Sequence, residues 1–220
     1  MQTLFIAVPT YDGKPEYTLT EWLCELSAYY ARHDTTLVIR FHPFSPSIAM
    51  SRAILFAQYI DTGLDSMLYI DADMRGTIDN VVSICNREAP VVSGVYMNRH
   101  DSRFAVVPKM PIKGLAEVPY IPMGFTRIRY EAACAMYYHY EDTLHSGTKC
   151  TTAGRPIVNV FAQGYFGDGE HVPFYHDEDF AFCWYYRQIG GKIYMDGDVH
   201  LNHAGIKVPD EETYVRHNKF

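Results

Sequence analysis

Two groups of carboxylates in this sequence have a spacing suited to chemistry. Asp71 and Asp73 directly follow the apolar run 67–70, which is typical of a buried strand. In an extended segment, residues two apart point to the same side, so both carboxylates could address one cation. Hard divalent ions take oxygen ligands and share them with substrate phosphates. The pair therefore indicates a site for a metal and a diphosphate, with two solvated turn aspartates as the alternative.

Glu178 and Asp179 form the second group, at the start of segment 178–189, which is expected to be a helix. One interpretation is helix capping, with Asp177 as the cap, because carboxylates are stabilised at the positive end of a helix. The other is catalysis, because a carboxylate in a water-poor pocket can act as a general base. The glycine-containing segment 164–172 is expected to be a loop, and with residues 172–175 it could form a lid.

Four other residues could bind a cation or a nucleotide. His203 is a candidate metal ligand if a cation is bound, although a lone histidine is more often a hydrogen-bonded structural residue. Arg52 could contact a phosphate or a base, with a solvated position as the alternative. Tyr11 could stack on a nucleobase, and Asp12 beside it could accept a hydrogen bond from a base or a ribose.

The composition limits the class of protein. With 220 residues, 48% of them hydrophobic and 20% charged, the chain is expected to be one globular domain with a substantial core. The net charge of -7 argues against a basic surface, so no nucleic-acid polymer is expected as a partner. An acidic protein that binds a diphosphate needs a cation to offset repulsion, which favours a metal-bridged site over an arginine cradle.

Cysteine usage and hydropathy indicate a cytoplasmic protein without a membrane span. The 5 cysteines are widely spaced, form no C-x-x-C pair and are expected to be reduced and largely buried. The N-terminal apolar run, 4–8, has only the length of a strand, and no apolar run approaches the roughly 18 residues of a membrane span.

The apolar patterns predict alternating strands and helices over the first hundred residues. Such alternation is typical of a doubly wound, largely parallel α/β sheet, which binds ligands beyond the carboxyl ends of its strands. Residues 10–13, 71–73 and 96–99 fall at such ends. Strands are expected at 4–8, 36–41, 67–70, 91–96, 123–128 and 192–196, and helices after a capping box at 18–21, at 48–60, after Thr77 and from Tyr130.

Several short motifs occur in a fixed order along the chain. They are V-P-T-Y-D-G at 8–13, S-R at 51–52, L-Y-I-D-A-D-M at 68–74, V-S-G-V-Y at 92–96, G-F at 124–125, E-D-F-A-F-C at 178–183, G-G-K-I-Y at 190–194 and H-A-G at 203–205. This series, which covers roughly residues 4–205, resembles the GT-A glycosyltransferases, especially small domains found in large DNA viruses, phages and bacterial polysaccharide clusters.

The resemblance implies a fold and an activity. The fold would be a Rossmann-like GT-A arrangement, with a mixed, mainly parallel central sheet flanked by helices. Residues 1–220 would form one catalytic domain, with a nucleotide-binding half at about 1–100, an acceptor half at about 101–205 and a tail at 206–220. The enzyme would move a sugar from a nucleoside diphosphate sugar, with a UDP-sugar favoured, to a hydroxyl of a carbohydrate or other acceptor. Its location would be the cytoplasm, that of the host if the protein is viral.

The resemblance also implies roles for individual residues. Asp73 would bind Mn2+ or Mg2+ directly, Asp71 would contact the ribose or reach the metal through water, and His203 would be the C-terminal metal ligand. Asp179 would be the base of an inverting reaction, with Glu178 beside it binding hydroxyls. The nucleotide pocket would be lined by Pro9, Thr10, Tyr11, Asp12, Arg52, Asp71 and Ala72, and the donor-sugar and acceptor pocket by Tyr96, Gly124, Phe125 and Asp177.

The residues leave other activities open. A retaining glycosyltransferase could use the same fold. A Mg-dependent phosphohydrolase could use the first of two aspartates after a strand as a nucleophile, although Met74 and Arg75 stand where Gly-Thr would be expected. A nucleotidyltransferase would need a basic, glycine-rich loop where residues 9–12 stand. A carbohydrate-binding module without turnover could use the 18 tyrosines.

Overall fold

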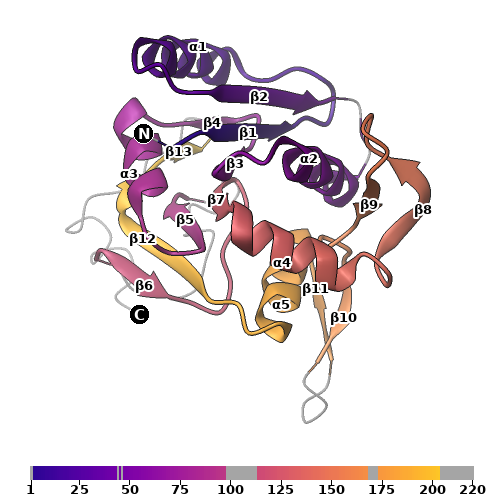
Figure 1. Cartoon of the computed structure of the whole chain (residues 1–220). Coiled ribbons are helices and arrows are strands. Elements are labelled where there is room, and N and C mark those ends of the chain that lie inside the picture. Colours follow the sequence, from indigo (N-terminus) through magenta and orange to yellow (C-terminus); the bar gives the residue numbers. More distant parts are fainter. Residues whose placement is uncertain (1, 44, 46, 98–112, 168–172, 204–220) are drawn as a thin grey trace.

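A seven-stranded sheet runs through the centre of the protein, with helices on both of its faces (Figure 1). The computed structural model describes residues 2–43, 45, 47–97, 113–167 and 173–203. In spatial order, the strands of this sheet are β2 (Leu37–His42), β1 (Leu4–Pro9), β3 (Ser66–Ile70), β7 (Phe125–Arg129), β5 (Val91–Val95), β12 (Ile193–His200) and β6 (Leu115–Glu117).

The sheet is mixed because β7 and β6 run against the other strands. β1 pairs in parallel with both β2 and β3, and β12 pairs in parallel with β5. β7 lies between β3 and β5 and is antiparallel to both, whereas β6 is antiparallel to β12 at the edge. The expected mixed, mainly parallel sheet is therefore confirmed, and six of its seven strands lie close to the positions that the apolar patterns predict, whereas the edge strand β6 was not expected.

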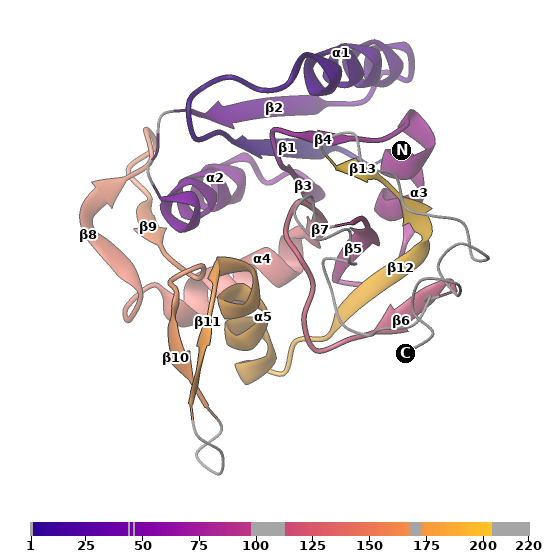
Figure 2. The ribbon, with the colours of Figure 1, turned by 180° about the vertical axis from the view of Figure 1, so that it is seen from behind.

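The helices divide between the two faces of the sheet, as the views from the front and from behind show (Figures 1 and 2). Side chains alternate along β1, so Leu4, Ile6 and Val8 pack with α1 and α3, whereas Phe5 and Ala7 pack with α2, α4 and α5. The helices in the described parts of the chain are α1 (Tyr17–Arg32), α2 (Ile48–Thr62), α3 (Ile78–Asn86), α4 (Tyr130–Tyr140) and α5 (Glu178–Gln188). Within those parts, none of them combines the length and the apolar character that crossing a membrane requires.

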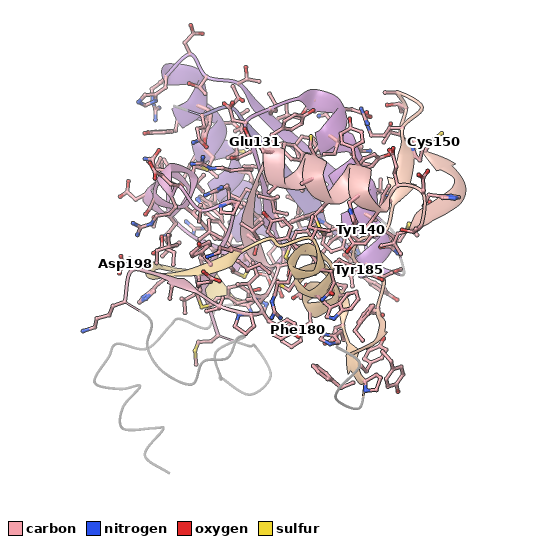
Figure 3. All side chains as sticks on the ribbon, turned by 60° about the horizontal axis from the view of Figure 1, so that its bottom comes forward. Glu131, Tyr140, Cys150, Phe180, Tyr185 and Asp198 are labelled. Carbon is pink, nitrogen blue, oxygen red and sulfur yellow. The ribbon has the colours of Figure 1, made fainter. Side chains whose placement is uncertain are left out.

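Helix α5 is anchored to α4 by the contact between Tyr140 and Tyr185. The hydroxyl of Tyr140 donates a hydrogen bond of 3.0 Å to the backbone oxygen of Tyr185, and their ring centroids lie 5.1 Å apart (Figure 3). Because α5 opens with Glu178 and Asp179, this anchor helps to position both carboxylates.

Short two-stranded sheets lie outside the central sheet. They pair β4 (Met74–Arg75) with β13 (Asn202–His203), β8 (His145–Cys150) with β9 (Pro156–Val158), and β10 (Gly164–Phe166) with β11 (Phe174–His176). The expectation that 164–172 is a loop is therefore wrong for its first residues, because Tyr165 and Phe166 are strong strand formers that pair with β11. Residues 168–172 of that expected loop and lid lie outside the described part.

The sequence signals for helix starts are confirmed at one helix and wrong at another. Thr77 begins α3 with a capping box, in which its hydroxyl accepts from the backbone N–H of Asn80 at 3.2 Å and the Asn80 side chain accepts from the backbone N–H of Thr77 at 2.8 Å. At α1, however, the N-cap is Glu16 rather than Thr18. The backbone N–H of Glu16 donates to Ala72 at 2.9 Å, and this tertiary contact fixes where the helix begins.

The cysteines are free thiols, but fewer are buried than expected. Cys85 and Cys183 are buried, whereas Cys24 and Cys150 are exposed. Cys24 lies on the outward face of α1, whose apolar residues Leu23 and Leu26 face the core. Cys150 ends the polar strand β8.

Substituting Thr77 by alanine should lower the free energy of unfolding by about 1 kcal/mol, because it removes the capping hydroxyl of α3. Urea unfolding followed by circular dichroism measures the change. The control is Thr20→Ala, which replaces an exposed threonine inside α1 and should leave stability unchanged or slightly raised, because alanine has the higher helix propensity. Equal losses in both variants would contradict the capping role.

Candidate functional site

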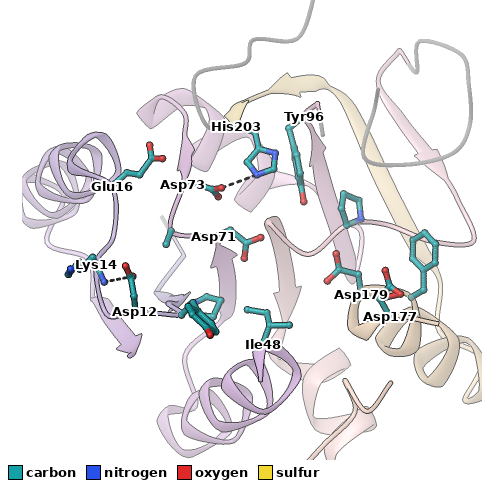
Figure 4. A pocket seen from close by; sticks show the side chains of 15 residues that line it. Asp12, Lys14, Glu16, Ile48, Asp71, Asp73, Tyr96, Asp177, Asp179 and His203 are labelled. Atoms are coloured by element: carbon teal, nitrogen blue, oxygen red, sulfur yellow. Dashed lines mark hydrogen bonds and ion pairs between the residues drawn. The ribbon is translucent and has the colours of Figure 1, made fainter. Parts of the chain in front are cut away.

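A pocket of about 620 Å³ opens at the carboxyl ends of β1 and β3 (Figure 4). It is the kind of position at which α/β sheets bind ligands, because loops from several strands converge there. Its wall is formed by Pro9, Tyr11, Asp12, Lys14, Glu16, Ile48, Asp71, Ala72, Asp73, Tyr96, Pro122, Asp177, Asp179, Phe180 and His203.

Asp73 and His203 lie in contact on one side of the pocket. The ladder between β4 and β13 pairs His203 with Met74, the residue after Asp73. The Nε2 atom of His203 is 3.3 Å from the Oδ2 atom of Asp73, while its Nδ1 atom is 2.8 Å from the backbone oxygen of Met97 (Figure 4). Burial lowers the pKa of His203, but the hydrogen bonds to Asp73 and Met97 and the charges of Asp73 and Asp71 outweigh it, so that the pKa is raised.

The donor atoms of Asp73 and His203 fit a divalent cation. Two ligands held at about 2.1 Å from an ion and at right angles to each other are about 3 Å apart, close to the observed 3.3 Å. Within the described residues there is no cluster of three or more acidic, histidine or cysteine side chains that could hold an ion. Mg2+ and similar ions commonly use few protein ligands and complete their shell with water and substrate phosphates, so a pair of protein ligands suffices for such a site.

Behind the pocket wall, Arg52 forms ion pairs with carboxylates on both sides of the pocket. This buried side chain lies in α2, and its Nη2 atom donates to Asp71 at 3.0 and 3.3 Å. Its Nη1 atom donates to Glu178 at 3.1 Å and also to Asp179. Although burial alone would lower the pKa of Arg52, the charges of these three carboxylates raise it, so the guanidinium stays charged.

The pKa of Asp179 is raised toward neutral pH. Burial raises its pKa to about 6, with Glu178 and Asp71 adding to the shift and Arg52 opposing it. Its Oδ2 atom accepts a hydrogen bond of 3.1 Å from the backbone N–H of Met123, and 25% of its side chain is exposed. Asp179 is therefore accessible from the pocket and changes protonation near neutral pH, which suits proton transfer.

Gly124 allows the backbone to pass close to Asp71 and Tyr96. Its N–H donates to the hydroxyl of Tyr96 at 2.8 Å, and its oxygen accepts from the N–H of Asp71 at 3.0 Å. A Cβ atom at this position would lie 2.5 Å from the Tyr96 hydroxyl and 2.9 Å from Oδ2 of Asp71, so any side chain would displace them. Tyr96 in turn packs edge-on against the ring of His203, with centroids 5.3 Å apart.

Most of the residues that the sequence singled out lie on the pocket wall, and five lie behind it. Arg52 is buried under the wall, and Glu178 accepts from Arg52 and from Gln163. Thr10 is buried with its N–H donating to His42, and Phe125 is buried against Trp22. Gly124 shapes the wall through Tyr96 and Asp71. Their expected ligand contacts stay predictions.

Five wall residues were missed by the sequence reasoning: Lys14, Glu16, Ile48, Pro122 and Phe180. Lys14 had the clearest sequence signal, because it follows Asp12 and Gly13, residues that favour a turn. In the structure, the N–H of Lys14 donates to the Asp12 carboxylate at 3.0 Å. Pro122 reaches the pocket through the tertiary course of the chain, which local sequence does not encode.

Comparison with known proteins supports the fold. No protein-family model matches the sequence, and no curated protein matches it. The chain is similar to the solved structure of A197 from STIV, with a TM-score of 0.51 and 16% identity, over 92% of this chain and 85% of that chain. Weaker similarity exists to TarS 1-349 of S. aureus (TM-score 0.47, 16% identity, 90% of this chain, 58% of that chain). It also exists to a glycosyltransferase involved in glycosylation of the major capsid of PBCV-1 (TM-score 0.37, 10% identity, 60% and 62%). At these identities, the similarity concerns the arrangement of helices and strands.

Replacing Arg52 by methionine should destabilise the protein by about 3 kcal/mol or more, because three carboxylates lose their buried partner. The loss should be largest at pH 8 and smaller at pH 5. Burial already raises the pKa of Asp179, and without the guanidinium this pKa rises further above its unfolded value, so ionisation of Asp179 opposes folding as the pH increases.

Urea unfolding at both pH values measures this effect. Arg40→Met is the matched control, because Arg40 is exposed on β2 and donates only to the backbone oxygen of Ile39 among the contacts described. A loss in Arg52→Met that is the same at pH 5 and pH 8 would contradict the electrostatic explanation.

Proposed function

We propose that the protein is a metal-dependent glycosyltransferase that moves a sugar from a nucleoside diphosphate sugar to an acceptor hydroxyl. A UDP-sugar is the favoured donor. The observation that carries the proposal is the pocket itself, which has the Asp73–His203 pair on one side and the partly exposed base Asp179 on the other. A cation-bound diphosphate and an acceptor hydroxyl could be held there on opposite sides of one sugar.

The charge of the pocket supports a cation between protein and diphosphate. Its wall carries the carboxylates of Asp12, Glu16, Asp71, Asp73, Asp177 and Asp179. Such a wall would repel a diphosphate, and Asp73 and His203 would hold a Mn2+ or Mg2+ ion that offsets the repulsion. When bound, the ion supplies stabilisation of the negative charge that develops on the departing diphosphate.

Asp179 would activate the acceptor. Its carboxylate accepts the proton of the acceptor hydroxyl while the hydroxyl oxygen forms a bond to the anomeric carbon of the donor. The bond from that carbon to the diphosphate oxygen breaks, and its electron pair leaves with the nucleoside diphosphate. Attack from the side opposite the leaving group inverts the configuration of the anomeric carbon. Arg52 and the N–H of Met123 keep the carboxylate oriented during the transfer.

The contacts of Asp71 count against the phosphohydrolase alternative. In that reaction Asp71 would attack phosphorus, but both of its carboxylate oxygens accept hydrogen bonds from the buried Nη2 atom of Arg52. A carboxylate held in this way is less nucleophilic, and one of its oxygens would have to leave Arg52 before it could react.

Binding of UDP should raise the melting temperature of the wild-type protein in the presence of Mn2+ and much less in its absence. Stabilisation follows from binding to the native state, and amounts to about 2.7 kcal/mol at a ligand concentration 100 times the Kd. Asp73→Asn should abolish the Mn2+-dependent part of the shift. Asp79→Asn, an exposed aspartate of α3, should keep it. A shift of equal size with Mn2+ and with EDTA, across UDP and GDP, would count against a metal-bridged site.

The rate of sugar transfer, or of slow hydrolysis of the donor by water, should depend on the ionisation of Asp179. With a pKa of about 6, kcat/KM should fall about tenfold for each pH unit below 6, because the protonated carboxyl cannot accept a proton. Asp179→Asn should lower kcat by about 10²–10⁴-fold. Glu117→Gln, at an exposed carboxylate of β6, serves as the control. Near-normal transfer by Asp179→Asn, or retention of configuration in the product, would exclude this base and this stereochemistry.

A further inference from the structure

The β10–β11 hairpin carries a pair of exposed tyrosines. Tyr165 and Tyr175 are directly opposite each other in the ladder, with ring centroids 5.5 Å apart. Their exposed fractions are 74% and 51%, high values for aromatic side chains. We call these two residues the tyrosine pair.

The tyrosine pair belongs to the outward face of the hairpin. The neighbouring residues in each strand point to the opposite face, since side chains alternate along a strand. On that inner face, Phe166 stacks on Trp184 of α5 with centroids 4.7 Å apart, and the buried ring of His176 packs near Phe180. The inner face therefore holds the hairpin on α5, and the packing of the fold does not account for the exposed rings on the outer face.

A chain of hydrogen bonds leads from the tyrosine pair to the carboxylates of the site. The hydroxyl of Tyr175 donates to Oε1 of Gln163 at 3.2 Å, and Nε2 of Gln163 donates to Oε2 of Glu178 at 3.0 Å. The other oxygen of Glu178 accepts from Arg52, which also binds Asp179. The outward face of the hairpin is thus linked by hydrogen bonds to the carboxylate beside the proposed base.

The size of the tyrosine pair is suited to a small or narrow ligand. A fully buried aromatic side chain contributes about 150–250 Å², so these two partly exposed rings offer roughly 190–310 Å². A stable protein interface needs about 800 Å² from each partner. Sugar rings match the pair better, because a pyranose has an apolar face of C–H groups and a rim of hydroxyls, as a tyrosine has an apolar ring and one hydroxyl.

The charge of this region argues against an anionic ligand. The described residues of the hairpin, 163–167 and 173–176, include no Lys, Arg, Asp or Glu, and three carboxylates follow at 177–179. An acceptor that carries phosphates would meet repulsion from these carboxylates without a basic side chain in the hairpin to offset it.

We infer that the tyrosine pair binds the acceptor of the proposed glycosyltransferase, and that this acceptor is a neutral glycan of several sugar units. One sugar stacks on Tyr165 and Tyr175, the chain passes Gln163 and Glu178, and the sugar that bears the reacting hydroxyl lies at Asp179. The role of the glycan as an acceptor rests on the proposed function. Binding of the glycan to the hairpin is a separate property that can be tested without it.

The test compares glycan binding by the wild type and by Tyr165→Ala/Tyr175→Ala on an array that carries neutral, acidic and phosphorylated oligosaccharides. The wild type should bind neutral oligosaccharides, and the double alanine variant should bind them about tenfold more weakly or worse. Tyr165→Phe/Tyr175→Phe should retain most of the binding, because it keeps both rings. Tyr138→Ala, at an exposed tyrosine of α4, should bind like the wild type. Circular dichroism and melting temperatures verify that all variants are folded.

Hydrolysis of UDP-sugars by water, measured on the same proteins, separates this inference from the proposed function. The double alanine variant should hydrolyse donors at the wild-type rate within about twofold, since the tyrosine pair lies outside the donor pocket. If no nucleoside diphosphate sugar is hydrolysed but neutral glycans still bind through the tyrosine pair, the proposed function fails and the glycan site stands.

Three results would overturn the inference: no binding of the wild type to any neutral glycan, equal binding by the double alanine variant, or binding restricted to phosphorylated glycans. A dimer that dissociates in Tyr165→Ala/Tyr175→Ala, seen by analytical ultracentrifugation, would assign the rings to a second copy of the chain and would also overturn it.

Discussion

The ion pairs of buried Arg52 with Asp71, Glu178 and Asp179 are the interaction on which the site depends. These carboxylates come from two places that are about a hundred residues apart in the sequence, the end of β3 and the start of α5. The planar guanidinium can donate to both at once, which a point charge such as a lysine ammonium does less well. Because an unpaired buried charge is unfavourable by several kcal/mol, neither element can move away alone. One side chain thereby sets the spacing between the two sides of the pocket.

The sheet could be predicted from the sequence in its elements but not in full topology. Apolar runs such as 67–70 and 91–96 mark buried strands because both of their faces are covered, and α3 was marked by Thr77 as its cap. The reversed direction of β7 could not be predicted, since an apolar run has no preferred direction. The β10–β11 pairing was also missed, because glycines that border short strands produce the same pattern as a loop.

Residues that follow a strand or open a helix made the candidate site partly predictable, although Thr10 and Glu178, which also do so, lie behind the pocket wall. Asp71, Asp73 and Asp179 satisfied that condition, and all of them line the pocket. The burial of Arg52 could not be foreseen, because an arginine in a helix is normally solvated and its carboxylate partners are far away in sequence. The contact of His203 with Asp73 depends on a two-residue ladder between β4 and β13, which is too short to leave a periodic signal.

That short ladder also bears on how the protein is made. It joins residues 74–75 to residues 202–203, so the imidazole reaches Asp73 only after residue 203 has left the ribosome. During synthesis, the first strands and helices can form before His203 is available to Asp73. Contacts of such long sequence separation form slowly, because the intervening chain must first be ordered. The contact between Asp73 and His203 would therefore form after the first strands and helices.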